Sequence, residues 1–571
     1  MWENTVFVVQ LLALWLKKAW AWWTQKSRKT LLFEAIANAT SYETWADFAF
    51  QLDECLDKDL WRQGFIDKAY DYRVIHERLT RIYEYQAAKD VLGLINLIRS
   101  GLVRNLGNIT APKLYNQAHA GTKLLIEDYI TQVALAIEYI TDLPPNATTW
   151  TAQTKLDVLH NSRAAYGRSV LVLQGGAVFG LCHLGVVKAL HLRGLLPRII
   201  AGTATGAIIA ALVGVRTEDE LLDSLTGENI DITAFTNLPY RDSGRLQTLY
   251  RRLKRWRSEG HFLDLEILKQ VLRSNVGEYT FEEAYERTKR VLNITVTTDG
   301  GPSIPNLLNY LTAPNVLIWS AALASNTTSS YESVTILAKN ERGEVVPWPL
   351  TAGRTLRPTS YGSYRNRKSP LHRIGELFNV NHFVISQARP YLAPFLRSDL
   401  YRPHPKQDRR WKLSMLVAHF VVGEIRHRLR QLDKLGMLPD DARRFLLDED
   451  VPGPSLTLVP EITPGDFFKL LENPTTEAIN YWILRGERSV WPVITALKIR
   501  LAIEVELDKG YQLVRARKPL KPLKGSSISS GQRRIDGKSE TRSTAYNETD
   551  NSSAKMSGRA RAASFGGGGV S

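Results

Sequence analysis

Two glycine-rich turns hold the residues of this 571-residue chain whose types and spacing could do chemistry. Each turn follows a short apolar run and precedes a stretch with apolar residues at helical spacing. The first turn, Gln174–Gly176, has glycines that let backbone N–H groups converge at the start of a helix, where they can bind an anion. The second turn, Gly202–Gly206, reads GTATG, and its small residues permit the sharp strand-to-helix reversal of a nucleophile elbow.

The elbow lacks the residue that would attack a substrate. A G-x-S-x-G elbow projects a serine hydroxyl from its central position, and that position is Ala204 here. A methyl group cannot attack an acyl carbon. Thr203 and Thr205 carry hydroxyls on either side, but only the central side chain of an elbow points at the oxyanion hole. We therefore expect both threonines to be packing residues, with a substitute nucleophile at either position as the alternative.

Other candidate sites carry less of the expected chemistry. Asp299 begins a D-G-G sequence directly after an apolar run and could supply a carboxylate, although a turn is the simpler interpretation. The corner Gly175–Gly180 could cradle a nucleotide phosphate, but no Lys-Ser/Thr pair follows it as in a P-loop. The two cysteines, Cys55 and Cys182, can form neither a disulfide framework nor a metal knuckle. We expect no metal, no cofactor and a reducing, intracellular compartment.

The two turns require strands that end at one edge of a sheet. Short β-rich runs alternate with helical patterns in the middle of the chain, which predicts an α/β domain with a mainly parallel sheet flanked by helices. The expected strands are Ser169–Leu173, Arg198–Ala201, Leu292–Thr297 and His382–Ser386, and the expected helices are Leu181–Leu192, Ala207–Val213 and Thr217–Leu225.

Composition and periodicity divide the rest of the chain. Apolar residues recur at helical spacing before and after the α/β part, and Ser, Gly and Arg dominate the last residues, which is typical of a disordered tail. We predict a Trp-rich membrane-interface segment at 1–25, a helical N-terminal domain at 30–165, an α/β domain at 166–400, a helical C-terminal region at 401–515 and a disordered basic tail at 516–571.

Charge and tryptophan content point to a lipid surface. The chain has 74 Lys and Arg against 58 Asp and Glu, and residues 515–571 alone hold 12 basic and four acidic side chains. Since half of the excess lies in the tail, nucleic-acid binding by the whole chain is not expected. Residues 1–25 hold five of the 14 tryptophans around a short apolar run interrupted by Lys17 and Lys18. This composition favours a segment lying at a membrane interface, with a membrane span or a buried helix as alternatives.

Several long stretches, in order, resemble the patatin-like phospholipase and triacylglycerol lipase family, specifically its fungal and plant branch with a helical N-terminal region. The matching stretches span about residues 30–510. They are LVLQGGAVFGLCHLGVVKAL at 171–190, the elbow followed by AIIAALVG, LLNYLTAPNVLIWSAALAS at 307–325, and RIGELFNVNHFVISQARPYLAPFL at 373–396.

The resemblance implies a Ser–Asp catalytic dyad without histidine, and this chain departs from it at both positions. Gly175 and Gly176 correspond to the oxyanion hole of the family. Ala204 stands where the serine belongs, and Tyr361 stands where the aspartate of a D-G-S element is expected. The following residues, 364–370, are basic where the family is usually acidic.

Three functional hypotheses follow from this combination. The first is a catalytically impaired family member that binds lipid or a protein partner, such as an active paralogue, at a membrane or lipid droplet. The second is a weak or atypical lipid acyl hydrolase with an unrecognised nucleophile. The third is a structural or interaction protein that keeps the fold for stability alone.

Overall fold

The computed structural model divides the chain into a compact unit, Met1–Arg517, and a second unit, Lys518–Ser571. All described residues belong to the first unit. None of the helices in the described ranges combines the length and the hydropathy that crossing a membrane requires. The described residues are 15, 17, 27–145, 150–175, 177–227, 230–231, 265–296, 307–326, 335–348, 370–388, 451–461 and 475–516, with scattered positions in 420–435 and 463–466.

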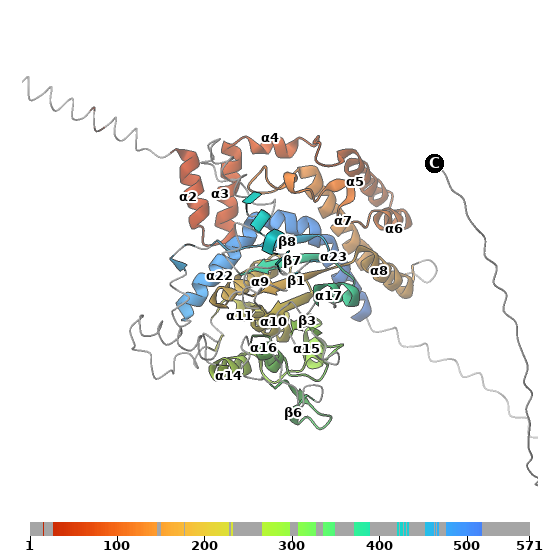
Figure 1. Cartoon of the computed structure of the whole chain (residues 1–571). Helices are drawn as coiled ribbons and strands as arrows, with labels where there is room; N and C mark the ends of the chain where they lie inside the picture. The colour runs from red at the N-terminus through yellow and green to blue at the C-terminus, as the bar shows by residue number, and fades with distance from the viewer. Residues whose placement is uncertain are drawn as a thin grey trace, which may run out of the picture. The chain divides into compact units, whose positions relative to one another are not determined.

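A six-stranded sheet lies at the centre of the compact unit (Figure 1). Its order is β4-β3-β2-β1-β7-β8, and all neighbours are parallel except β3 and β4. The prediction of an α/β fold with a mainly parallel sheet is confirmed. The strands are β1 (Arg168–Gln174), β2 (Ile199–Thr203), β3 (Val291–Thr295), β4 (Leu307–Leu308), β7 (Val380–Gln387) and β8 (Ser455–Leu458), and β5 (Leu337–Lys339) and β6 (Val345–Pro347) form a separate hairpin.

Strand β1 lies in the middle of the sheet, between β2 and β7. Its last residue, Gln174, is in register with Thr203 of β2 and Gln387 of β7. The carboxyl ends of three neighbouring strands therefore coincide at one edge. Loops at this edge of a parallel sheet are the usual place for a functional site, and both glycine-rich turns begin there.

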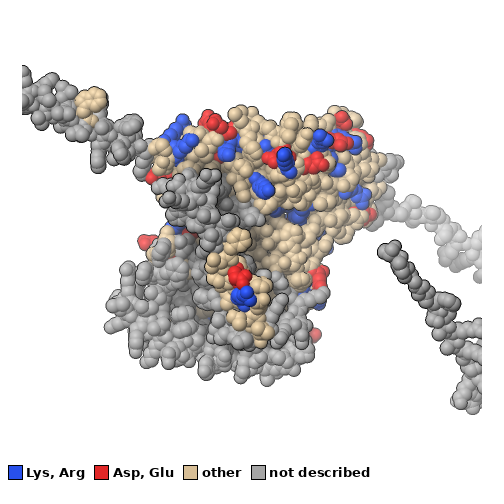
Figure 2. Space-filling view, turned by 45° about the horizontal axis from the view of Figure 1, so that its top comes forward, with Lys and Arg blue, Asp and Glu red and all other residues tan. Residues whose placement is uncertain are grey.

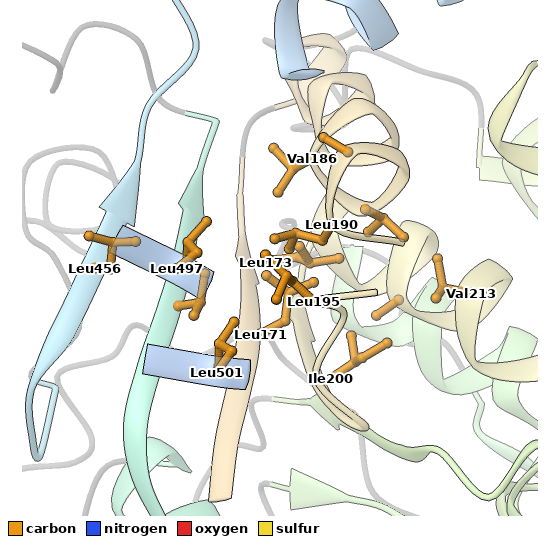
Figure 3. Packing of buried hydrophobic residues seen from close by; sticks show 14 of the residues in the cluster. Leu171, Leu173, Val186, Leu190, Leu195, Ile200, Val213, Leu456, Leu497 and Leu501 are labelled. Carbon is orange, nitrogen blue, oxygen red and sulfur yellow. The ribbon is translucent and has the colours of Figure 1, made fainter. Parts of the chain in front are cut away.

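Both faces of β1 are buried, as its continuous apolar run predicts. Leu171 and Leu173 point toward Val186 and Leu190 on α9, and this side belongs to the main core (Figure 3). Val170 and Val172 lie on the opposite face and pack with a second cluster that includes residues of α17. The helices around the sheet are α9 (Cys182–Leu192), α10 (Thr205–Val215), α11 (Glu218–Leu225), α14 (Leu265–Val276), α15 (Phe281–Thr288), α16 (Ile318–Asn326) and α17 (Pro370–Phe378).

Helices from both ends of the compact unit pack around this α/β core (Figure 1). Sequence periodicity predicted these helical stretches, and side-chain caps such as Ser41 at the start of α3 fix where several of them begin. The helices are α2 (Arg28–Asn38), α3 (Tyr42–Cys55), α4 (Lys58–Gln63), α5 (Tyr72–Ala87), α6 (Val91–Ser100), α7 (Leu124–Asp142), α8 (Ala152–Tyr166), α22 (Thr476–Val490) and α23 (Ile494–Ala516).

A buried ion pair joins three parts of the chain at the amino end of the sheet. Arg104, which follows α6, donates to the Glu504 carboxylate on α23 at 2.8 Å. The same carboxylate accepts hydrogen bonds from the backbone N–H and the hydroxyl of Ser169 on β1, at 2.7 and 2.6 Å. The Arg104 guanidinium and the Glu504 carboxylate both have partners inside the protein. These contacts therefore hold the N-terminal and C-terminal helical regions against the sheet.

Several predicted features lie outside the described residues. Only Trp15 and Lys17 of the Trp-rich segment 1–25 are described, and only Ala516 of the tail 516–571. Gly176, Asp299 and Tyr361 also fall outside the described ranges. The predicted domain boundaries stay predictions. In the C-terminal region at 401–515, the structure shows a strand, β8, in addition to helices.

Candidate active site

A strained turn connects β2 to α10 at the carboxyl edge of the sheet. Ala204 is the single residue between them, with φ 54° and ψ −127°. A residue with a Cβ pays about 1–3 kcal/mol to adopt such a sparsely populated conformation. The chain therefore keeps the backbone of a nucleophile elbow although its central side chain is a methyl group.

Close backbone contacts explain why glycines flank the elbow. A Cβ at Gly202 would lie 2.6 Å from the Cα of Ala207 on the first turn of α10. A Cβ at Gly206 would collide with the carbonyl oxygen of Leu173 on β1. Neither position has room for a side chain, so the two glycines allow the helix to start directly above the strand ends.

The two threonines beside Ala204 face neighbouring structure. Thr203 Oγ1 lies 2.6 Å from Oγ1 of Thr295 on β3, so this hydroxyl is directed along the sheet. The Thr205 side chain packs on the glycine corner, since a Cβ at Gly180 would lie 2.5 Å from its methyl carbon. The structure thus places both threonines in packing contacts, and neither is brought to the central position.

A different hydroxyl reaches the elbow. The backbone N–H of Ala204 donates a hydrogen bond to Oγ of Ser325, at 3.0 Å. Ser325 lies near the end of α16, 121 positions further along the chain. Sequence reasoning did not identify this residue, because the only signal was its place at the end of the stretch 307–325 that resembles the family.

The glycine corner and the elbow lie side by side. Gly175 follows β1 with φ 60°, and its N–H donates to the carbonyl oxygen of Thr203 at 3.3 Å. The corner continues as a short 3₁₀ turn, Ala177–Leu181, which leads into α9. The two turns predicted from the sequence are therefore brought together, with the N-terminal ends of α9 and α10 at the same edge.

A buried histidine on α9 lies within hydrogen-bond distance of the glycine corner. His183 on α9 has Nδ1 2.7 Å from the Ser386 hydroxyl and Nε2 3.4 Å from the Gly175 carbonyl oxygen. Because a carbonyl only accepts, Nε2 carries the proton and Nδ1 accepts from Ser386. Burial lowers the pKa of His183 to about 4, so the ring is neutral near pH 7. No sequence pattern marks this histidine as functional, and its two hydrogen bonds position the corner.

Helix α22 covers the outer side of the corner. Phe179 of the 3₁₀ turn packs edge-on against Trp482 of α22, with ring centroids 5.3 Å apart. Cys182 and Ala388 complete this small buried cluster. Burial also raises the pKa of the Cys182 thiol, which leaves it protonated and unreactive at neutral pH. The cluster fixes the corner but supplies no reactive group.

Comparisons with known proteins show which family the chain is similar to. A family model described as patatin-like phospholipase matches residues 171–339, and one described as a domain of unknown function (DUF3336) matches residues 22–164. Triacylglycerol lipase ptl1 of Schizosaccharomyces pombe is 36% identical over 471 residues, which cover 82% of each chain. Triacylglycerol lipase ptl3 of the same organism is 30% identical, covering 85% of this chain and 98% of its own. Triacylglycerol lipase SDP1L of Arabidopsis thaliana is 32% identical, covering 85% and 58%.

Proposed function

The chain belongs to the patatin-like triacylglycerol lipase family of fungi and plants, and on this premise we propose that it is a catalytically impaired member that binds lipid at a membrane or lipid-droplet surface. The observation that carries the proposal is Ala204 in the elbow. Its backbone has the conformation that would present a nucleophile, and its side chain has none. Hydrolysis through an acyl-enzyme needs a hydroxyl at that point and a base to take its proton.

The hydroxyls of Thr203 and Ser325 do not replace the missing serine nucleophile. Thr203 is paired with Thr295, and Ser325 accepts the Ala204 N–H. The hydrogen bonds of the described residues join the Ser325 hydroxyl to no carboxylate or imidazole. Without a base among the described residues that it contacts, this hydroxyl is a weak nucleophile, because a positioned base typically contributes about 10²–10⁴-fold. Tyr361, in place of the expected aspartate, supports the same conclusion from the sequence.

Lipid binding is proposed on two grounds. The relatives are named triacylglycerol lipases, so the family works on substrates that are poorly soluble in water. Residues 1–25 have the composition of an interfacial segment, and the basic residues of the tail suit an anionic surface. A protein partner such as an active paralogue would be recruited to the same surface.

Four versions of the protein test the catalytic part: wild type, Ala204→Ser, Tyr361→Asp and the double variant. Hydrolysis of a fluorogenic short-chain ester by wild type should equal that of a heat-denatured control. Serine adds one oxygen to a site of small residues, so Ala204→Ser should fold, and thermal unfolding of all four proteins shows whether the Tyr361→Asp variants fold as well. The double variant should exceed the product of the two single effects, since nucleophile and base act as a unit.

Two outcomes would contradict the proposal and favour another function. Robust turnover by wild type on triacylglycerol, lost in Ser325→Ala, would show an atypical hydrolase that uses this hydroxyl. A folded double variant as inert as wild type would show that more of the pocket has changed than its two dyad positions, in favour of a purely structural role. Arg365 and Arg367 give a reason for the second outcome, because they could hold the new carboxylate as an ion pair.

A further inference from the structure

Both polar groups of Gly175 have partners inside the protein. Its N–H donates to the carbonyl oxygen of Thr203 at 3.3 Å, and its carbonyl oxygen accepts from Nε2 of His183 at 3.4 Å. The imidazole ring also interacts with the backbone of Gln174, the residue directly before this glycine. Hydrogen bonds to β2 and to α9 therefore hold Gly175 from two sides, in the left-handed conformation of its φ of 60°.

The peptide group after Gly175 converts this contact into a direction for the next backbone N–H. A trans peptide is planar, and its C=O and N–H point to opposite sides. The Gly175 carbonyl is directed at His183, which is completely buried, whereas Gly175 itself is half-buried beside the elbow. We therefore expect the N–H of the same peptide group, which belongs to Gly176, to point away from the buried ring.

Helix α9 carries a buried polar ring where an apolar side chain would fill the space. Burying an imidazole is unfavourable unless its nitrogens are hydrogen-bonded. Both partners of His183, Ser386 and Gly175, lie at the carboxyl edge of the sheet. The ring therefore serves the glycine corner rather than the packing of the helix. The other buried residues of α9 are Cys182, Leu184, Gly185, Val186, Val187, Ala189 and Leu190.

No charged side chain replaces a backbone donor at the corner. Among the described residues, the hydrogen bonds and close contacts that Gly175 and Ala204 make with side chains involve His183 and Ser325, neither of which carries a charge near pH 7. On the face that Figure 2 shows, blue and red residues are interspersed over the N-terminal helices, without a large patch of one sign. An oxyanion at this edge would therefore depend on backbone N–H groups and on their orientation.

We propose that His183 is a positioning residue: through the Gly175 carbonyl it directs the next backbone N–H toward the elbow, so that the chain keeps a formed oxyanion hole without a nucleophile. This role rests on the proposed function and extends it. The impaired site would still stabilise the negatively charged oxygen that forms when an acyl carbon is attacked.

A thiol at the central position of the elbow makes the oxyanion hole measurable without restoring the lipase. In the full-length Ala204→Cys protein, the thiolate attacks p-nitrophenyl acetate: the C–S bond forms, the bond from the acyl carbon to p-nitrophenolate breaks, and the thiol proton passes to the buffer. The intermediate carries a negative oxygen that the hole must stabilise. Alkylation by iodoacetamide breaks a carbon–iodine bond and forms no such oxygen, so the ratio of the two rates isolates the hole.

Three variants of the Ala204→Cys parent test the role of the ring. His183→Leu should lower the acylation rate roughly 10- to 100-fold and leave alkylation unchanged, since removing a whole oxyanion-hole donor costs about 10²–10³-fold. His183→Gln, with an amide N–H near the position of Nε2, should keep most of the rate. The matched control is His382→Leu, which removes another buried histidine, beside Ser169 at the amino end of the sheet. The wild-type chain, with its own two cysteines, supplies the background rates.

Three outcomes would overturn the proposal. Equal ratios of the two rates in His183→Leu and its parent would show that the ring does not direct the N–H. A parallel fall of both rates would show that the ring only supports the fold. A parent whose introduced thiol is not alkylated, or is acylated no faster than free cysteine at the same thiolate fraction, would show that no open oxyanion hole is formed.

A variant of Ser386 covers the case in which thermal unfolding shows that His183→Leu does not fold. Ser386→Ala leaves the ring in place but frees Nδ1 to carry the proton, so it should also lower acylation relative to alkylation. The proposed function is decided separately, because ester hydrolysis by the wild-type chain alone shows whether the protein is catalytically impaired.

Discussion

The backbone N–H of Ala204 and the hydroxyl of Ser325 form a hydrogen bond of 3.0 Å that joins the elbow to the end of α16. The bond is made by the residue with the strained backbone, at the point where β2 turns into α10. A strained conformation persists only where the surroundings hold it. Ser325 is one of the groups that hold it, together with the close contacts at Gly202 and Gly206.

Removing the Ser325 hydroxyl should destabilise the protein. Ser325→Ala leaves the half-buried Ala204 N–H without its partner, and the loss of one such hydrogen bond costs about 0.5–1.5 kcal/mol. Urea unfolding should show this loss in the free energy of unfolding. Ser325→Thr keeps the hydroxyl and serves as the control; an alanine variant as stable as wild type would mean that the bond does not support the elbow.

Glycine at position 204 should be tolerated unusually well. An alanine to glycine change ordinarily costs about 0.5–1 kcal/mol in chain entropy. At φ 54° the glycine also relieves strain of about 1–3 kcal/mol, so Ala204→Gly should unfold at the same or a higher temperature. Ala204→Val, with its branched Cβ, should unfold at a lower temperature. Calorimetry that ranks glycine below alanine would show an unstrained elbow.

Alanine at Gly486 should force α22 away from α9. A Cβ there would collide with the Cys182 carbonyl oxygen and lie 3.0 Å from the Cα of Gly185. We expect Gly486→Ala to cost about 1–3 kcal/mol, as overpacking does. Gly375→Ala on α17 is the control, because its Cβ would come no closer than 3.4 Å to any atom. Equal unfolding temperatures for the two variants would contradict the close helix crossing.

Stability should fall between pH 6.5 and pH 5, partly through His183. The folded pKa is about 4, below the value of about 6.5 expected in the unfolded chain. In this range the unfolded chain binds a proton at His183 that the folded protein does not bind. The free energy of unfolding therefore decreases as the pH falls. One such group contributes up to about 1.4 kcal/mol per pH unit.

His183→Gln should make this slope shallower, measured by urea unfolding at pH 7, 6 and 5. His382 keeps part of the slope, because its burial also holds its pKa well below the usual range. The exposed His372, changed to Gln, is the matched control and should leave the slope as it is. A His183→Gln protein with the wild-type slope would show that folding does not lower the pKa of this ring.

The elements that sequence could predict are those with a strong local signal. Strand β1 and helix α9 follow from a continuous apolar run, a glycine corner and a helical pattern, and the structure confirms both. Strand β4 has two residues and β8 has four, which is too little for a periodic signal. Their place in the sheet depends on partners far away in the sequence.

The site residues differ in the same way: some have a strong local sequence signal, and others depend on residues far away in the sequence. Ala204 could be placed because glycines and an apolar helix surround it. Ser325 could not, since its bond crosses 121 positions. His183 was missed for a related reason: its role depends on Ser386, 203 positions later, and on burial that only the folded sheet creates.

The central place of β1 has a consequence for synthesis on the ribosome. Its partner β7 comes much later, with Gln174 and Gln387 separated by 213 positions. At about 5–20 residues per second, the chain takes about 10–40 s to complete this pairing. Throughout that time one edge of an apolar strand stays open, and such an edge pairs readily with other chains. The nascent protein should therefore depend on chaperones that bind it early, and products that stop before β7 should aggregate.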